Sequence, residues 1–327
     1  MRDYCRVTAA DAGFGNPDFD PVDFDRQLLE SAVGESPEPV GGRLGHVVEA
    51  GGKRIRPLLV FYFGRLCDGP TTGLTQLALA VEMLHSATLV HDDLIDQAET
   101  RRGRPAVQRQ FGPEAAVLVG DLYVARCGVH LARLGVPRAA AEIWGALDTM
   151  VRGEMGQRDH LFDTGQTAAD YMLTIERKTA SLLQAACAGA VIASGGEERL
   201  VAAAREYASN LGRAFQLVDD VLDYAGEPDE LGKPVGNDIR EGTVTLPLIL
   251  AMEGSTAPIA AMLKAARERD DYSAVVQAVR RSGAIDRCLE VADRLSRKAV
   301  GALDPFPQGS GREALAELAL SSPRRRA

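Results

Sequence analysis

Two short acidic clusters are the part of this sequence best suited to chemistry. Each has the pattern Asp-Asp-x-x-Asp, at residues 92–96 and 219–223. The first and last aspartates of each cluster stand four residues apart, which places them on one face of a helix, where like charges destabilise by roughly 0.2–0.5 kcal/mol. Carboxylate oxygens suit Mg²⁺, which takes few protein ligands and adds water and phosphate oxygens. The clusters therefore predict two helices that face each other across a cavity and bind a diphosphate through Mg²⁺.

Basic segments accompany the acidic clusters. Arg101-Arg102-Gly103 follows the first cluster, Gly232-Lys233-Pro234 follows the second, and Gly51-Gly52-Lys53-Arg54-Ile55-Arg56 lies upstream of both. In the upstream segment a lysine and an arginine can grip a diphosphate beside glycines that allow close approach. The sequence thus implies two diphosphate sites, one built with metal ions and one built from basic side chains alone. A condensation of two diphosphate substrates needs such a pair of sites. One substrate then loses its diphosphate to give an allylic cation, and the other offers its double bond.

Helices are expected to position these groups. Aromatic residues make up only 5% of the chain, alanine is abundant, and long segments run without proline, a composition typical of helices. Clusters of glycine and proline divide the chain into about ten or more helices, with longer polar loops at 97–113 and 226–242. We predict an all-α fold, a single large helical bundle around a central cavity. A loosely structured lead-in at residues 1–35, with a short helix near Phe24–Val33, would precede a single domain at 36–327.

The composition excludes several other classes of protein. The net charge of −9 leaves no basic face for a nucleic acid. Five scattered cysteines without a CxxC pair argue against a disulfide framework and a zinc site, and fit a reducing cytoplasm. No basic N-terminal segment precedes an apolar run, and no uninterrupted apolar stretch reaches about 18 residues, so neither export nor a membrane span is expected.

Together the motifs resemble those of the trans-polyprenyl diphosphate synthases, the polyprenyl synthetase family, over most of the chain. The matching segments, in chain order, are Gly51–Pro57, His85–Asp93, Arg101–Gly103, Gly120-Asp121, Gly153–Gln157, Lys178–Ala180, Phe215–Asp220, Gly232–Pro234, Asp238 and Thr245–Pro247. The resemblance implies the isoprenoid synthase fold and the trans condensation of isopentenyl diphosphate with an allylic diphosphate. It also implies a cytoplasmic homodimer.

The resemblance further implies a role for each matching residue. Three Mg²⁺ ions would be ligated, once diphosphate is bound, by Asp92, Asp96 and Asp219, supported by Asp93, Asp220 and Asp223. The allylic diphosphate would be contacted by Arg101, Lys178 and Lys233. Isopentenyl diphosphate would be held by Lys53, Arg56, His85 and Arg102. The carbocation would be stabilised by the dipoles of Thr179 and Gln216, and the released diphosphate would accept the proton.

One position departs from the family pattern. After Glu241-Gly242 many members carry a lysine that touches the allylic diphosphate, and this chain has Thr243. Similar non-basic residues occur in the long-chain branch that makes quinone side chains, which the segment Gly242–Pro247 resembles. That branch includes enzymes that need a small second subunit, so a small regulatory partner is a further expectation.

Product length is expected to depend on the helix that carries the first acidic cluster. In the family the growing chain descends along this helix, and each turn of about 5.4 Å is close to one extended isoprene unit. The positions one to three turns before Asp92 are Ala87, Thr88, Leu84 and Val81. None is aromatic, so we predict a product of C30 or longer. Trp144, the single tryptophan, is interpreted as a core residue, with a tunnel floor as the alternative.

Other interpretations remain open on the sequence alone. A shorter geranylgeranyl-type synthase and the catalytic subunit of a two-component synthase share the same motifs. A non-catalytic subunit commonly lacks the aspartates, which are all present here. A class I terpene cyclase also ionises an allylic diphosphate but needs only one diphosphate site. The pair His91-Asp92 could also belong to a metal phosphohydrolase, although only five histidines are present.

Overall fold

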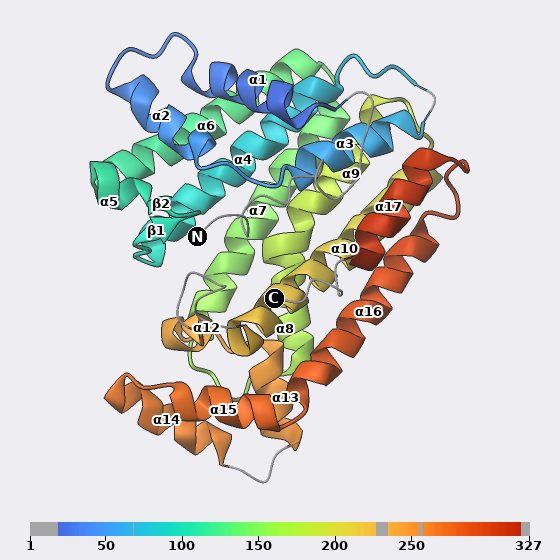
Figure 1. The fold of residues 1–327 in the computed structure, drawn as a ribbon. Helices are drawn as coiled ribbons and strands as arrows, with labels where there is room; N and C mark the ends of the chain where they lie inside the picture. Colours follow the sequence, from blue (N-terminus) through green and yellow to red (C-terminus); the bar gives the residue numbers. More distant parts are fainter. Residues whose placement is uncertain (1–18, 68, 227–234, 255–257, 322–327) are drawn as a thin grey trace. The chain divides into compact units, whose positions relative to one another are not determined.

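The computed structural model describes residues 19–67, 69–226, 235–254 and 258–321, and these residues are mainly helical (Figure 1). The elements are α1 Pro21–Val33, α2 Val40–Glu49, α3 Ile55–Arg65, α4 Leu74–Ile95, β1 Thr100–Arg101, β2 Arg104–Pro105, α5 Val107–Phe111, α6 Pro113–Leu134, α7 Pro137–Asp159, α8 Ala168–Ile175, the π-helical turn η1 Glu176–Ala180, α9 Ser181–Ala193, α10 Glu198–Ala225, α12 Asn237–Glu241, α13 Leu246–Gly254, α14 Ile259–Arg269, α15 Ser273–Arg281, α16 Ala284–Ala302 and α17 Ser310–Ser321. The all-α prediction is confirmed.

The chain folds as two compact units, each described by itself. Of the described residues, those within 1–147, 185–204 and 305–315 form unit 1, and those within 148–184, 205–304 and 316–327 form unit 2. The first acidic cluster belongs to unit 1 and the second to unit 2.

The start of unit 1 shows how local sequence sets a helix. The side chain of Asp20 accepts a hydrogen bond from the backbone of Val22 at 2.9 Å, and Pro21 occupies the first turn of α1, an arrangement that favours helix initiation. Phe24 and Leu28 are buried. The short helix expected near Phe24–Val33 is therefore present, but its buried face makes it part of unit 1 rather than of a loosely structured lead-in.

Helices α4 and α6 pack side by side in unit 1 (Figure 1). The close approach requires Gly120, because a Cβ atom there would lie 2.0 Å from Nε2 of His91. The same nitrogen lies 3.3 Å from the carbonyl oxygen of Val117. His91 is thus engaged in helix packing, which removes the support for a phosphohydrolase built on His91-Asp92.

A short hairpin interrupts the helical pattern after α4. Strands β1 and β2 pair antiparallel and are joined by two residues, Arg102 and Gly103, with φ of 52° and 76°. Two successive positive φ values are typical of the tight hairpin turn whose twist matches that of the strands. The predicted polar loop at 97–113 is therefore structured, and the hairpin fixes the positions of Arg101 and Arg102.

Unit 2 has a separate apolar core. Its residues come mainly from the second half of α10 and from α13, α15 and α16, and include Leu217, Tyr224, Leu248, Val275 and Ala292. At its edge, α8 begins with a reciprocal capping box between Thr167 and Asp170, a strong local start signal.

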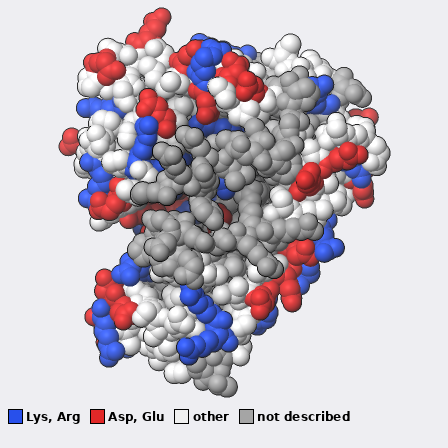
Figure 2. Space-filling view, viewed as in Figure 1, with Lys and Arg blue, Asp and Glu red and all other residues white. Residues whose placement is uncertain are grey.

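One helix among the described residues, α6, is long and apolar enough to cross a membrane by length and composition alone. Its buried residues, among them Ala116, Val119 and Tyr123, belong to the core of unit 1, as expected of a helix in a globular unit. On the face shown in Figure 2, acidic and basic side chains are intermixed over the described residues.

Candidate active site

The first acidic cluster lies in the last turn of α4. Asp92 is half-buried and Asp96, the C-cap residue, is exposed, whereas Asp93 is only 3% exposed. A helix C-terminus already carries partial negative charge, so three carboxylates there need nearby positive groups. Two of the three remain accessible to a ligand.

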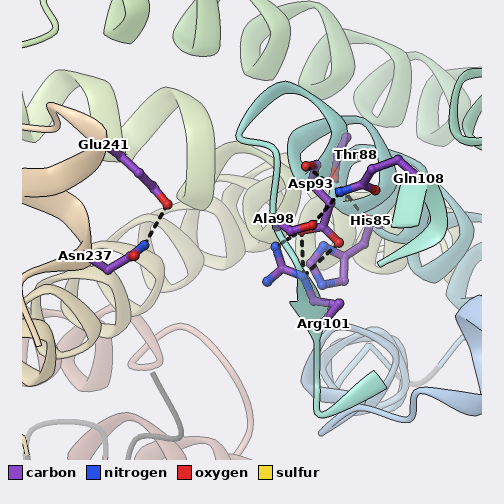
Figure 3. Close-up of polar contacts among 8 residues, drawn as sticks. All are labelled: His85, Thr88, Asp93, Ala98, Arg101, Gln108, Asn237 and Glu241. Carbon is purple, nitrogen blue, oxygen red and sulfur yellow. Dashed lines mark hydrogen bonds and ion pairs between the residues drawn. The ribbon is translucent and has the colours of Figure 1, made fainter. Parts of the chain in front are cut away.

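Arg101 supplies the positive group for Asp93. Its Nε lies 2.9 and 3.1 Å from the two carboxylate oxygens, and an Nη also donates to Asp93 (Figure 3). The amide of Gln108 donates to the carbonyl oxygens of Asp93 and Ala98, at 2.9 and 2.7 Å. Arg101, predicted to contact a diphosphate, is thus held by a carboxylate, and Gln108, which the sequence did not single out, fixes the end of α4.

A second, basic cluster forms in unit 1. The guanidinium of Arg102 lies against Gly52, where a Cβ atom would be 2.7 Å from Nη1. Arg56 is half-buried, and its Nε is buried without a hydrogen-bond partner among the described residues. Removal from water lowers the pKa of Arg56, and the charge of Arg102 lowers it further, against the charge of Glu82. Unpaired buried donors of this kind are suited to an anion.

His85 completes this cluster and is held neutral. Removal from water lowers its pKa well below the ordinary value, and the charges of Arg56, Arg102, Arg54 and Arg101 add to the shift. Three of the four residues predicted to hold isopentenyl diphosphate, Arg56, His85 and Arg102, are therefore brought together, and the fourth, Lys53, is exposed on the same loop as Gly52.

The neutral His85 predicts a pH-dependent stability. Below pH 6.5 the unfolded chain binds a proton at this residue that the folded chain does not, so the free energy of unfolding falls with decreasing pH by up to ~1.4 kcal/mol per unit. His85→Gln removes this contribution. Because Asp220 titrates in the opposite sense, the measured quantity is the difference between wild type and variant in urea unfolding from pH 7.5 to 5. Parallel curves would contradict the prediction.

The second acidic cluster lies in the last turns of α10 in unit 2, where Asp219 is exposed and Asp220 is buried. The hydroxyl of Tyr171 donates to Asp220 at 2.5 Å, and the amide of Gln216 donates to its other oxygen at 2.7 Å. Burial raises the pKa of Asp220 to about 7, and the charges of Asp219 and Asp223 act in the same direction, against the two hydrogen bonds. Tyr171 was not identified from the sequence.

The amide of Gln216 is fixed at both ends. The hydroxyl of Thr179 donates to its oxygen at 2.8 Å, while its nitrogen donates to Asp220. The two residues predicted to lie near the reacting carbons are therefore adjacent, and they form one hydrogen-bonded chain with Asp220 and Tyr171.

Asp223 holds the start of α12. Its two carboxylate oxygens accept hydrogen bonds from the backbone nitrogens of Asn237 and Asp238, at 3.2 and 3.1 Å. Asn237 also donates to Glu241 one turn later at 2.6 Å (Figure 3). Asp223, 1% exposed, thus organises the start of α12.

Lys178 and Thr179 lie in the π-helical turn η1, an irregularity that is frequent at functional sites. Two glycines let neighbouring helices approach this turn: a Cβ at Gly153 would be 2.9 Å from Arg177, and one at Gly212 would be 2.8 Å from Ala180. Nζ of Lys178 lies 2.5 Å from Glu154 of α7. Lys178 is thus paired with a carboxylate, as Arg101 is in unit 1.

Thr243, the departure from the family pattern, accepts a hydrogen bond from Gln157 at 3.3 Å. Its backbone nitrogen donates to the carbonyl oxygen of Asp238 at 2.8 Å. The predicted diphosphate contact Lys233 lies outside the described residues.

The donors present fit Mg²⁺ better than a metal that needs a complete protein cage. Within the described ranges no three Asp, Glu, His or Cys side chains converge as a ready-made metal cluster. Asp92 and Asp96 instead offer one helix face of carboxylate oxygens, while Asp93 is turned to Arg101. Mg²⁺ is usually held by one or two carboxylates together with substrate phosphates, and this arrangement has that character.

The four positions assigned to product length lie on α4. Val81, Leu84 and Ala87 are at most 1% exposed, and Thr88 is half-buried, with its hydroxyl donating to the carbonyl oxygen of His85 at 2.9 Å. The interpretation of Trp144 as a core residue was wrong, because it is 39% exposed, with its ring 3.4 Å from the Cβ position of Gly128 on α6.

The chain is similar to known proteins over most of its length. The polyprenyl synthetase family matches residues 40–281. A heptaprenyl diphosphate synthase component 2 from Geobacillus stearothermophilus is 36% identical over 89% of this chain and 92% of its own, and an octaprenyl diphosphate synthase from Haemophilus influenzae is 37% identical over 87% and 88%. A polyprenyl synthase from Caulobacter crescentus, solved with calcium and isoprenyl diphosphate, superimposes with a TM-score of 0.88 at 35% identity, over 94% of this chain and 95% of that one.

The helical fold and the paired acidic clusters define an isoprenoid synthase of the prenyltransferase class. The chain belongs to the polyprenyl synthetase family. Members of this family use divalent metal ions with diphosphate substrates.

Proposed function

We propose that this protein condenses isopentenyl diphosphate with an allylic diphosphate, in trans and repeatedly, to give a polyprenyl diphosphate of C30 or longer. Mg²⁺ is the proposed metal, with three ions in the diphosphate-bound state. The relatives from Geobacillus stearothermophilus and Haemophilus influenzae are named for heptaprenyl and octaprenyl products, which supports the long-chain assignment.

One observation in unit 1 carries this proposal. The basic cluster includes His85, and the acidic cluster begins at Asp92, seven residues further along α4, or about 10 Å along the axis. One helix thus presents a site of metal-binding character and an anion site of arginines with a neutral histidine. A condensation needs both, because one diphosphate must leave and the other must stay. A terpene cyclase needs only the first.

The residues of the chain then have separate tasks. Asp92, Asp96 and Asp219 hold the metal, with Asp93, Asp220 and Asp223 as supports, and the allylic diphosphate is contacted by Arg101, Lys178 and Lys233. When bound, Mg²⁺ neutralises charge on the leaving diphosphate.

The second diphosphate, that of isopentenyl diphosphate, is held by Lys53, Arg56 and Arg102. The neutral His85 adds a hydrogen-bonding group there without further charge. Thr179 and Gln216, fixed by their mutual hydrogen bond, present dipoles to the developing cation.

The test uses the pure chain, labelled isopentenyl diphosphate and C10, C15 or C20 primers, with products identified by mass spectrometry. We expect polyprenyl diphosphates of C30 or longer, formed only with both substrates and Mg²⁺, and none in EDTA. Hydrocarbon formed from the allylic substrate alone would establish a cyclase instead. Condensation that is unaffected by EDTA, or products no longer than C20, would overturn the metal or the length assignment respectively.

A partner chain is a separate question. The Geobacillus relative is named as component 2, and we propose that this chain, which has both acidic clusters, supplies the catalytic groups itself. Activity of the pure chain supports that proposal. Inactivity of a folded, metal-loaded chain contradicts it and points to a second subunit.

A homodimer is proposed on the surface of α6. Val117, Leu118, Leu122 and Val129 are 36–60% exposed on this helix, and Trp144 lies beside it. A row of exposed apolar side chains of this kind marks an interaction surface. Sedimentation of the pure chain measures the oligomeric state directly. Cytoplasmic localisation remains part of the proposal.

A further inference from the structure

Arg54 has an unusual backbone. It is the residue before α3, and its φ of 50° and ψ of 33° place it in the left-handed region, which is unfavourable for every residue that has a Cβ atom. Gly51, three residues earlier, also has a positive φ of 76°. Residues held in such conformations by their surroundings cluster at functional sites, and Arg54 lies between Lys53 and Arg56, two proposed substrate contacts.

The Arg54 side chain explains why the conformation persists. Its Nε donates to Asp25 of α1 at 2.6 Å, and Nη1 donates to Glu82 of α4 at 2.6 Å. Nη2 lies 3.4 Å from the carbonyl oxygen of Val48 in α2. The side chains of Arg54 and Glu82 are each only 3% exposed. A single buried guanidinium therefore ties the loop before α3 to three other helices.

Stability alone does not account for this ion pair. Burying two charges costs about as much as their attraction returns, and apolar replacements of both partners are often neutral or stabilising. What the pair does supply is a fixed geometry. Glu82 lies one helical turn before His85 on α4, so the ion pair is adjacent to the basic cluster.

The electrostatic surroundings link the pair to the same cluster. Glu82 is the acidic residue whose charge acts on Arg56, and Arg54 is among the cations that act on His85. The loop itself reaches the cluster through the contact of Gly52 with Arg102. The segment 51–56 is thus held at its centre by Arg54 and contacts the anion site on both sides.

We propose that Arg54 and Glu82 are positioning residues for the diphosphate site that works without metal. Their ion pair fixes the backbone from which Lys53 and Arg56 extend, so that both cations are placed before the substrate arrives. The inference rests on the proposed function in that the substrate of this site is isopentenyl diphosphate. Loss of the ion pair weakens binding of isopentenyl diphosphate. Binding of the allylic diphosphate and the dependence of activity on Mg²⁺ stay unchanged.

The experiment compares Arg54→Met, Glu82→Met and the double variant Arg54→Met/Glu82→Met. Arg54→Met leaves the buried carboxylate of Glu82 without its cation, and Glu82→Met leaves the buried guanidinium with only Asp25 as a carboxylate partner. Each single variant is therefore expected to lower Tm, whereas the double variant recovers stability. All three are expected to raise KM for isopentenyl diphosphate by about tenfold or more, with KM for the allylic substrate within about twofold of wild type. A raised KM for isopentenyl diphosphate in the double variant, together with a restored Tm, would show that the ion pair positions the substrate contacts and does not act only through stability.

Arg126→Met is the matched control. This arginine is also partly buried, and it donates to the carbonyl oxygens of Ser31 and Val33 and to the hydroxyl of Ser36. Its loss is expected to lower Tm and to leave both KM values unchanged. Equal increases in both KM values in the double variant, or a wild-type KM for isopentenyl diphosphate, would overturn the inference.

Binding measured without turnover keeps the two proposals distinguishable. Calorimetric titration of the protein with isopentenyl diphosphate in EDTA reports on the basic site directly. Wild-type protein that condenses its substrates while the double variant binds isopentenyl diphosphate normally contradicts the positioning role alone. Wild-type protein that forms no product contradicts the proposed function, whatever the variants bind.

Discussion

Replacing Asp92 by asparagine is expected to lower kcat by about 10²–10³-fold, the typical effect of removing one group that stabilises developing charge. The substitution keeps the size of the side chain and removes its negative charge. Because Asp92 is half-buried in the last turn of α4, and removing one of three adjacent charges relieves repulsion at a helix C-terminus, Tm is expected to stay the same or rise. Asp219→Asn, at an exposed position of α10, is expected to behave alike.

The dependence on metal concentration identifies the cause of this loss. If Asp92 ligates Mg²⁺, the concentration of Mg²⁺ that gives half-maximal activity rises in the variant. Asp148→Asn is the control, because Asp148 is an exposed aspartate of α7 that pairs with Arg152 at 2.9 Å. Full activity of Asp92→Asn with an unchanged dependence on Mg²⁺ concentration would show that the metal does not bind at α4.

Asp93→Asn distinguishes a residue that supports the site, as proposed for Asp93, from one that ligates the metal, as proposed for Asp92. Asp93 is buried and bonded to Arg101, so its neutral replacement loosens the arginine and lowers both kcat and Tm. The contrast between the two neighbours is the informative result: Asp92 affects catalysis without a loss of stability, and Asp93 affects both.

Local patterns made the helices and the acidic clusters predictable. The apolar spacing before Asp92 and Asp219 depends on neighbours within a few turns, and the structure has these residues near the ends of α4 and α10. The positive φ of Arg102 and the burial of Phe24 in unit 1 depend on partners elsewhere in the chain. The hairpin and the packing of α1 were therefore not predicted in detail. The sharing of metal ions by the two clusters stays a prediction.

The supporting contacts were the part that sequence reasoning missed. Tyr171 and Asp220 are 49 residues apart, and Arg54 and Glu82 are 28 apart, so no helical or strand periodicity connects them. A signal existed for one of them. Glu82 is the one charged residue within the apolar segment Leu74–Leu84, and a buried carboxylate requires a cation. The predicted role of Lys178 likewise gave no hint of its partner Glu154.

Ala87→Phe is expected to shorten the product from C30 or longer to about C15–C20. Ala87 is 1% exposed and lies five residues before Asp92 on α4, about 7.5 Å along the helix axis. An aromatic ring there would block a chain that descends along α4 after one or two further isoprene units. Product length is read by mass spectrometry at saturating isopentenyl diphosphate, with C10 as primer.

A graded series makes this prediction specific to the tunnel. Val81 lies eleven residues before Asp92, about 16 Å along the axis, so Val81→Phe is expected to give a product longer than that of Ala87→Phe and shorter than that of wild type. Ser86→Phe is the control for overpacking, because Ser86 is also buried on α4 but points about 100° away from Ala87 and about 140° away from Val81. It is expected to lower Tm without altering product length. Equal product lengths for Ala87→Phe and Val81→Phe in folded protein would show that the chain does not grow along this helix.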